Sequence, residues 1–243
     1  MRPPARIVAL VLSVATLAMG LAAGIGGWPG GGGVAFLIDF PDCEASGGGL
    51  ISQPTATWTS LAFVVVGIWI AGDRRLISLP ARLLFATALV TVGIGSFLGH
   101  AALTDGARRL DSLAIKLMLV AFIAASLGRL WSWQPSAWPA GWASLAVPTI
   151  ALELTWPATR KPLLAILVVT AAALVWLSTT PETRRWLVQG LALLGAGGAA
   201  WWLGRAGGPL CAPWAWFQLH GLWHILAAAG IASVYQLYRS EAT

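Results

Sequence analysis

The sequence predicts an all-α polytopic membrane protein: a bundle of seven transmembrane helices preceded by one extra amino-terminal hydrophobic segment. Three observations predict this fold. Hydrophobic residues make up 58% of the 243 residues and charged residues only 10%, against roughly 25% charged in soluble domains. The mean hydropathy is +0.77. Fifteen tryptophans fit the aromatic belts that form where a protein crosses the two membrane interfaces.

Eight hydrophobic runs follow one another, most of them close to the ~20 residues that cross the bilayer core. They span residues 6–25, 57–72, 80–101, 110–131, 139–156, 162–178, 185–203 and 215–238. Charged residues, glycine or proline separate the runs, as at Asp73-Arg74-Arg75, Asp105-Gly106 and Gly207-Gly208-Pro209. The run 57–72 is short, and Pro148 is expected to interrupt the run 139–156.

Residues 1–33 form a separate amino-terminal unit. Arg2 and Arg6 precede a long apolar stretch that ends in small residues near Ala22-Ala23-Gly24, which is typical of a signal peptide or an uncleaved signal-anchor. Glycine dominates residues 24–33, so this stretch is expected to be a flexible linker. The functional seven-helix domain is therefore expected to be residues 34–243.

The net charge of +6 predicts membrane topology rather than a nucleic-acid partner. The basic residues are scattered at segment ends, whereas a nucleic-acid surface gathers them on one element. If the first core helix runs from outside to inside, nine Lys and Arg residues lie inside and five outside, which favours this orientation. We therefore expect an integral protein of the bacterial inner membrane whose site opens to the periplasmic leaflet.

The two cysteines agree with this topology. Cys43 precedes the first core helix and Cys211 precedes the last, both on the expected outer side. A pair on an oxidising face can form a disulfide. The alternative is two unrelated buried thiols.

All three histidines of the chain fall in hydrophobic segments near a hydroxyl and a carboxylate. Residues four apart share a helix face, which places Ser96 beside His100 and His220 beside His224, while Asp111 lies eleven residues after His100. Ionisable groups inside membrane helices are costly and usually functional. Three neutral imidazoles suit catalytic zinc, which keeps a further position for water. A carboxylate can move protons, and a hydroxyl can stabilise an oxyanion.

Each of these residues also has a purely structural interpretation. A membrane histidine often makes helix-to-helix hydrogen bonds, and Ser96 could bond the backbone of its own helix. Asp111 could pair with Lys116 or cap the start of its helix. Glu153 is expected to be an interfacial carboxylate. These interpretations explain poorly why every histidine falls in one arrangement.

The motifs resemble those of the alkaline ceramidase family. Residues 93–100 are similar to its Gly-x-Gly-Ser-x-x-x-His motif, residues 110–112 (Leu-Asp-Ser) to its Leu-Asp-Glu, and residues 220–224 to its His-x-x-Trp-His. Asp42-Cys43-Glu44 and Trp58 resemble its amino-terminal signature. The resemblance covers residues 40 to 240. The wider superfamily includes the progestin and adipoQ receptors and haemolysin III-like proteins.

The resemblance implies a seven-helix zinc amidase that cleaves ceramide-like N-acyl lipids to a long-chain base and a fatty acid. The implied zinc ligands and catalytic residues are His100, His220, His224, Asp111 and Ser96. It also implies a disulfide between Cys43 and Cys211. Two alternatives remain: a receptor or haemolysin III-like protein with structural zinc and no turnover, and a proton-coupled transporter.

The family also carries a calcium site around the same Cys-Glu pair. Asp42 and Glu44, with Asp39 as a further candidate, are the calcium ligands that remain here, whereas Ser46 stands for an expected asparagine and Ala56 for an expected glutamate. Calcium takes six to eight oxygen ligands, so the loss of two side-chain ligands is expected to weaken this site.

Overall fold

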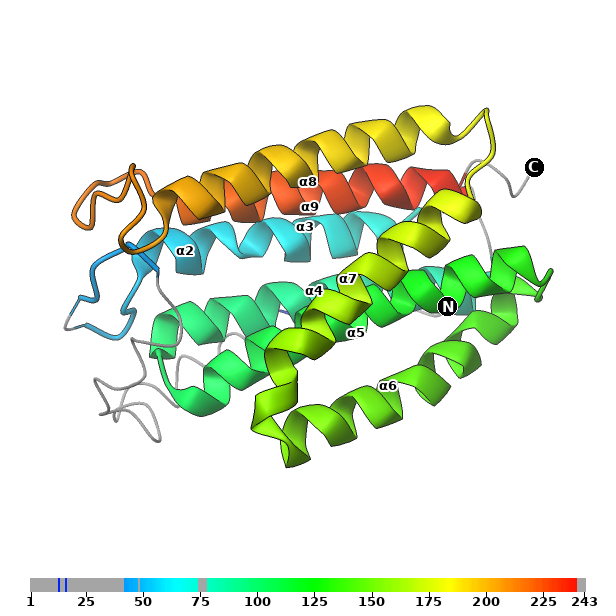
Figure 1. Ribbon diagram of the computed structural model, residues 1–243, viewed down its shortest axis with the longest axis horizontal. Helices are drawn as coiled ribbons and strands as arrows, with labels where there is room; N and C mark the ends of the chain where they lie inside the picture. Colours follow the sequence, from blue (N-terminus) through cyan, green and yellow to red (C-terminus); the bar gives the residue numbers. More distant parts are fainter. Residues whose placement is uncertain (1–12, 14–15, 17–41, 48, 74–77, 240–243) are drawn as a thin grey trace, which may run out of the picture.

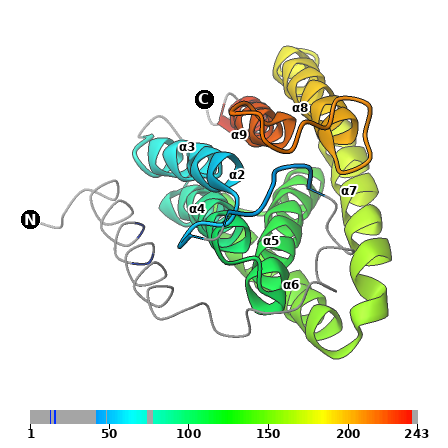
Figure 2. The ribbon, with the colours of Figure 1, turned by 90° about the vertical axis from the view of Figure 1, so that its left-hand side faces the viewer.

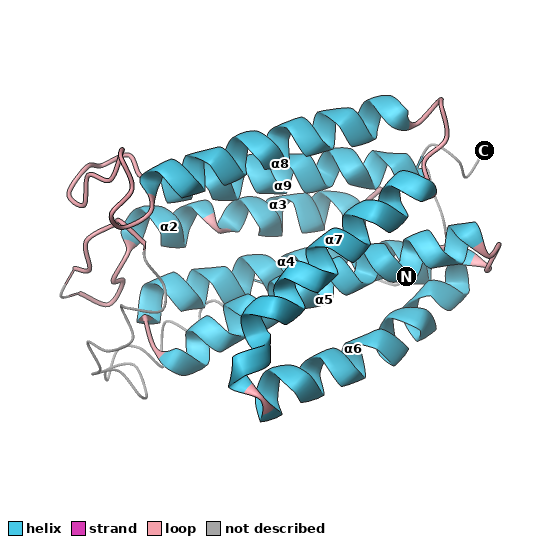
Figure 3. Cartoon of the chain, viewed as in Figure 1, coloured by secondary structure: helices cyan, strands magenta, loops and turns pink. Residues whose placement is uncertain are grey.

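The computed structural model describes residues 42–47, 49–73 and 78–239, together with Ser13 and Thr16. The α-helices in these ranges are α2 (Pro54–Thr59), α3 (Leu61–Ala71), α4 (Leu79–Ala102), α5 (Asp105–Leu130), α6 (Trp138–Thr155), α7 (Arg160–Leu177), α8 (Arg184–Gly204) and α9 (Leu219–Arg239). Short 3-10 helices, η2 (Pro135–Ala137) and η3 (Pro157–Thr159), precede α6 and α7. In the same ranges, β structure is limited to an isolated bridge between Asp42 and Arg205. Figure 3 accordingly shows helices and loops but no strand arrow in the described part of the chain.

The long helices run side by side along the longest axis of the molecule (Figure 1). α4 lies between α3 and α5, and α9 packs against α8, α2 and α3. α5 also contacts α6 and α7, and α7 crosses its neighbours obliquely (Figures 1 and 2). As a result, four helix segments meet at one end of the bundle: α2, the end of α4, and the beginnings of α5 and α9.

Within the described residues, five helical segments are long and apolar enough to cross a membrane: Pro54–Ala71, Leu79–Ala102, Asp105–Leu130, Pro157–Leu177 and Arg184–Gly204. The prediction of an all-α membrane fold is confirmed to this extent. α6 and α9, with 18 and 21 residues, lie alongside these five. The predicted amino-terminal unit, residues 1–33, lies outside the described residues apart from Ser13 and Thr16, so its role as signal or anchor stays a prediction.

Each predicted hydrophobic run between residues 57 and 238 corresponds to helical structure, with four local differences. α5 begins at Asp105 rather than at residue 110, because the Thr104 side chain caps the helix there. The first core helix begins at Pro54 rather than at residue 57, because proline suits the first turn of a helix. The expected interruption at Pro148 is wrong, since α6 continues through this residue from Trp138 to Thr155. The fourth difference concerns the start of the last helix.

α9 begins at Leu219 rather than at residue 215. The side-chain amide of Gln218 donates hydrogen bonds to the carbonyls of Ala212, Pro213 and Ala215, at 3.0, 3.3 and 2.8 Å. These bonds hold the apolar residues before Leu219 in a loop rather than a helical turn.

A short connection brings the end of α4 back against the start of α5. Leu103 ends α4 in the left-handed conformation, with φ 50°, and the Thr104 side chain caps α5. A Cβ atom added to Gly99 would lie 3.1 Å from Cβ of Asp111, closer than ordinary van der Waals contact. The two helices can approach this closely because residue 99 has no side chain. Asp111 therefore lies against the turn of α4 that carries His100.

A buried ion pair joins α5 to α6. Lys116 Nζ lies 2.8 Å from Glu153 Oε2, and the two side chains are 1% and 0% exposed. Lys116 also donates to Ser112 Oγ at 2.6 Å, and Arg160 Nε lies 3.5 Å from Glu153 Oε1. Glu153 is therefore a buried carboxylate whose charge is compensated inside the bundle, and its expected position at the membrane interface stays a prediction.

Candidate metal centre

Three histidine side chains from two helices meet at the end of the bundle where α2, α4, α5 and α9 converge. His100 lies in the last turn of α4, while His220 and His224 lie one turn apart at the start of α9. One ligand atom from each ring lies within 4.8 Å of those of the other two. His100 and His224 are buried, and His220 is 14% exposed. Packing thus brings together the three residues that the sequence singles out.

The Nδ1 atoms of His100 and His220 contact acceptors from outside their own helices. His100 Nδ1 lies 2.8 Å from Oε1 of Gln53, and His220 Nδ1 lies 3.1 Å from Oδ1 of Asp42. Arg108 joins the two acceptors, because its Nη2 donates to Asp42 Oδ2 at 2.6 Å and to Gln53 Oε1 at 3.1 Å. Burial alone would raise the pKa of Asp42, but the interactions with His220, His100 and Arg108 hold that pKa well below its ordinary value.

The third ring, His224, is held by the first core helix. Its Nδ1 lies 3.1 Å from the backbone carbonyl oxygen of Ala56, and the hydroxyls of Thr59 and Ser60 lie 3.1 and 3.3 Å from the same atom. Phe63 packs edge-on against the ring, with the centroids 6.0 Å apart. Because a carbonyl oxygen only accepts hydrogen bonds, this contact places the proton of His224 on Nδ1.

Ser96 and Asp111 lie beside the histidines. Ser96 is buried, and the hydroxyl of Ser60 donates to its Oγ at 3.1 Å. The Asp111 side chain lies next to Gly99, accepts a hydrogen bond from the hydroxyl of Ser96 and lies near the imidazole of His220. Among the described residues, no hydrogen-bond partner is found for its buried Oδ1 atom. This oxygen is an acceptor that a water molecule in the site would satisfy.

The structural interpretations of Asp111 do not fit these contacts. The cap of α5 is Thr104, so Asp111 is not needed for that purpose. Lys116, the other expected partner, is paired with Glu153 instead. The remaining neighbours of Asp111 belong to the metal centre.

The donor set of this centre suits zinc. Gln53, Asp42 and the Ala56 carbonyl each accept a hydrogen bond from one Nδ1 atom, which leaves the Nε2 lone pair of every ring available as a ligand. Three neutral imidazole nitrogens are a typical ligand set of catalytic zinc. The buried acceptor of Asp111 lies in the same region. The residues therefore fit a zinc ion held by the three histidines.

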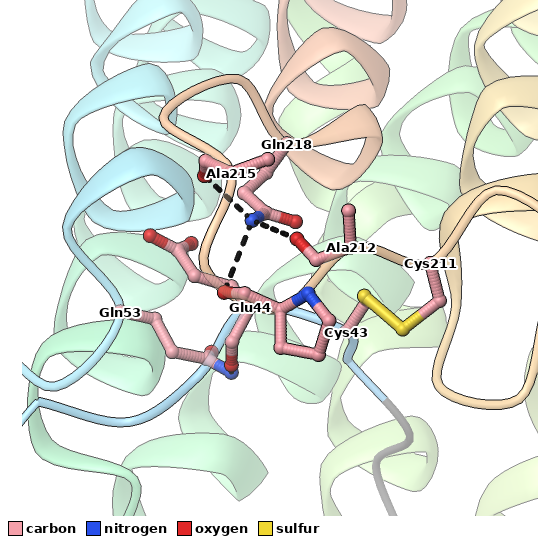
Figure 4. Close-up of a disulfide and its surroundings, with 8 residues drawn as sticks. Cys43, Glu44, Gln53, Cys211, Ala212, Ala215 and Gln218 are labelled. Atoms are coloured by element: carbon pink, nitrogen blue, oxygen red, sulfur yellow. Dashed lines mark hydrogen bonds between the residues drawn. A yellow bond between two sulfur atoms is a disulfide. The ribbon is translucent and has the colours of Figure 1, made fainter.

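A disulfide between Cys43 and Cys211 closes the same end of the molecule (Figure 4). The predicted pairing is confirmed. Figure 4 also shows the amide of Gln218, whose hydrogen bonds shape the loop between the bridge and α9. Because Asp42 precedes Cys43 directly, the bridge ties the Asp42 segment to the loop that leads to His220.

The candidate calcium ligands Asp42 and Glu44 both have partners within the protein, and the further candidate Asp39 lies outside the described residues. Glu44 Oε1 and Oε2 accept hydrogen bonds from the backbone N–H groups of Thr55 and Ala56, at 2.7 and 2.9 Å. This arrangement stabilises the start of α2, where free N–H groups favour a negative charge. Asp42 is ion-paired with Arg108. Calcium binding stays a prediction, at two carboxylates whose oxygens already have donors.

Three residues of the site, Gln53, Ser60 and Arg108, have no role in the prediction from sequence. For Arg108 a signal was available, since it precedes Asp111 by one helical turn and shares its face. No comparable pattern marks Gln53 or Ser60, because their contacts with the histidines arise only when separate helices pack together.

The described part of the chain is a helical bundle with segments that can cross a membrane. It contains a buried cluster of three histidines beside a carboxylate and a serine. These features define a membrane protein with a candidate hydrolytic metal centre. The Ceramidase family model matches residues 50–240 of the chain. The chain therefore belongs to the Ceramidase family, which supports hydrolysis of the amide bond of a ceramide-type membrane lipid. Among curated proteins, no sequence matches it significantly. The matched region contains all three histidines and leaves Asp42 and Glu44 outside.

Proposed function

We propose that the protein is a zinc-dependent membrane amidase, which hydrolyses ceramide-like N-acyl lipids to a long-chain base and a fatty acid. The observation that carries this proposal is the cluster of His100, His220 and His224 with Asp111 and Ser96 beside it. The family match includes all five positions. The buried Oδ1 of Asp111 further supports a site that takes a polar reactant.

Bound zinc supplies Lewis-acid activation for attack on the amide carbonyl. In the proposed reaction, the Asp111 carboxylate accepts a proton from the attacking water and then delivers it to the amide nitrogen as the C–N bond breaks. The long-chain base therefore leaves as a neutral amine. Ser96 donates its one hydroxyl proton to the Asp111 carboxylate. Once Asp111 has taken up the proton of water, this hydroxyl turns to donate a hydrogen bond to the oxyanion that forms from the carbonyl oxygen. Ser60, whose hydroxyl donates to Ser96 Oγ, orients that group.

In the proposed membrane arrangement, α6 and α9 complete a set of seven spanning helices. With 18 and 21 residues, they are about 27–32 Å long, close to the ~30 Å thickness of the hydrocarbon core. The excess of Lys and Arg on one side supports an orientation in which the metal centre faces the outer leaflet of a bacterial inner membrane. The disulfide at the same end supports this orientation, since disulfides persist on oxidising faces. Residues 1–33 act as signal peptide or signal-anchor plus linker.

The test uses the full chain purified in detergent. Bound metal is measured by mass spectrometry, and ceramides and other N-acyl lipids are screened for release of fatty acid and base. We expect stoichiometric zinc and turnover. His220→Ala is expected to lose both, whereas Asp111→Asn is expected to keep zinc and lose turnover. Asp105→Asn, a change at an exposed carboxylate of the same helix, is the matched control and should keep both.

The outcomes separate the proposed amidase from its alternatives. Stoichiometric zinc without turnover on any N-acyl lipid would favour a receptor or haemolysin III-like protein with a structural metal. Absence of zinc from the folded protein would refute the amidase. Transport of a solute that survives removal of the metal would favour the proton-coupled transporter.

A further inference from the structure

We propose that Asp42 and Gln53 are positioning residues of the metal centre, which orient His220 and His100 and are themselves held in place by Arg108. The inference rests on the proposed zinc-dependent function and extends the site to three segments of the chain. Asp42 precedes α2, Gln53 is its amino-terminal cap residue, and Arg108 lies in the first turn of α5. Two of the three zinc ligands thus depend on side chains that lie outside their own helices.

The side-chain amide of Gln53 has one orientation that satisfies all its contacts. Its Nε2 donates to the backbone carbonyl of Glu44 at 3.1 Å, so Oε1 is the atom turned towards His100 and Arg108. An amide oxygen only accepts hydrogen bonds, so His100 Nδ1 must carry a proton and donate it. Gln53 is 2% exposed, and bulk water therefore does not reach this contact. The lone pair of His100 is left on Nε2, where metal binding needs it.

Asp42 acts on His220 in the same way and adds a negative charge. Its Oδ1 lies 3.1 Å from His220 Nδ1, and its Oδ2 lies 2.6 Å from Arg108 Nη2. The carboxylate accepts from Nδ1, which again leaves the ring's lone pair on Nε2. The ion pair with Arg108 offsets the cost of burying the carboxylate, which is 7% exposed. A carboxylate behind a ligating imidazole also makes the imidazole a stronger donor to a metal.

The backbone around Asp42 is fixed at three points. Asp42 pairs with Arg205 in the isolated bridge, Cys43 is bonded to Cys211, and the Glu44 carboxylate binds the start of α2. A short polar segment is therefore held rigidly against the metal centre. A positioning residue requires rigid support of this kind, because it can hold a metal ligand in one orientation only if it is itself held in place.

The experiment measures zinc affinity and ligand geometry in the full chain. Zinc dissociation constants are obtained by competition with a chromophoric chelator, and cobalt-substituted protein gives visible absorption bands that report on the geometry of the ligands. Asp42→Asn and Gln53→Leu are each expected to weaken zinc binding roughly 10–100-fold and to shift the cobalt bands. Asp42→Glu, which keeps the carboxylate, is expected to bind zinc more tightly than Asp42→Asn.

Asp105→Asn is the matched control. Asp105 is ion-paired with Arg109 at the start of α5, but its side chain is 56% exposed. Its loss is expected to change zinc affinity by less than about twofold, as for other exposed ion pairs. Circular dichroism and gel filtration of the zinc-free proteins show which variants are folded. If Asp42→Asn does not fold, Gln53→Leu decides the question, because it leaves the ion pair with Arg108 in place.

The proposed function and this inference fail differently. If the folded wild-type protein binds no zinc, the proposed function is wrong. If the wild-type protein binds zinc, and folded Asp42→Asn and Gln53→Leu bind it as tightly as Asp105→Asn with unchanged cobalt bands, the positioning role is wrong and the amidase proposal stands.

Discussion

Replacing Gly99 with alanine is expected to lower turnover about tenfold while zinc stays bound. The added Cβ would lie 3.1 Å from Cβ and 3.3 Å from Oδ2 of Asp111, so this side chain must move by a few tenths of an ångström. A displacement of about 1 Å at a reacting group lowers the rate roughly 100-fold. A displacement of a few tenths of an ångström is therefore expected to lower the rate about tenfold, which corresponds to ~1.4 kcal/mol in the activation barrier. Helix propensity itself favours alanine by about 1 kcal/mol, so unfolding should not explain the loss.

The assay compares kcat, zinc content and thermal stability of Gly99→Ala with those of Gly198→Ala. Gly198 also lies inside a helix, and a Cβ added there meets no atom within 4 Å. The control variant is expected to keep wild-type turnover. If Gly99→Ala turns over as fast as Gly198→Ala, the close contact between α4 and Asp111 does not position the carboxylate, and the reasoning is refuted.

Three further predictions concern the ion pair between α5 and α6, the cap of α5 and the serine of α4. Glu153→Gln is expected to cost about 3–5 kcal/mol of unfolding free energy, because it leaves Lys116 buried without its counter-charge. Lys116→Met should cost less, since Arg160 Nε remains 3.5 Å from Glu153. Unfolding of both variants in detergent measures the two costs, and equal costs would contradict this reasoning. Thr104→Ala is expected to lower the stability by about 1 kcal/mol through loss of the α5 cap, with Thr104→Ser restoring most of it. Ser96→Ala is expected to lower kcat about 100-fold at constant zinc content; loss of zinc would show a structural role instead.

The membrane helices could be placed from sequence because the bilayer fixes their length. The run 80–101, for example, corresponds to Leu79–Ala102. Boundaries set by side-chain hydrogen bonds could not be placed in this way. Residues 215–218 are mostly apolar, yet the Gln218 amide holds them in a loop. The hydrophobicity of a segment does not indicate whether local side-chain hydrogen bonds will compete with helix formation.

The cluster of three histidines could be predicted from the sequence, whereas the residues that contact it could not. His220 and His224 share a helix face through their spacing, and ionisable groups are rare enough in this chain to stand out. Gln53 and Arg108 are polar residues near helix ends, where polar residues are common. Their contacts with the ligands depend on how α2, α4 and α5 pack, which no local pattern determines.

Calcium is expected to bind weakly at Asp42 and Glu44. Both oxygens of Glu44 would have to give up backbone N–H groups of α2, and one oxygen of Asp42 would have to give up a guanidinium. Ser46 and Ala56 supply no carboxylate or amide oxygen in compensation. A calcium concentration 100 times the dissociation constant would add about 2.7 kcal/mol to the stability and raise the Tm by several degrees. We expect millimolar calcium to change the Tm of the zinc-loaded protein no more than millimolar magnesium does. A rise specific to calcium that Glu44→Gln abolishes would show instead that the two carboxylates exchange their protein donors for the ion.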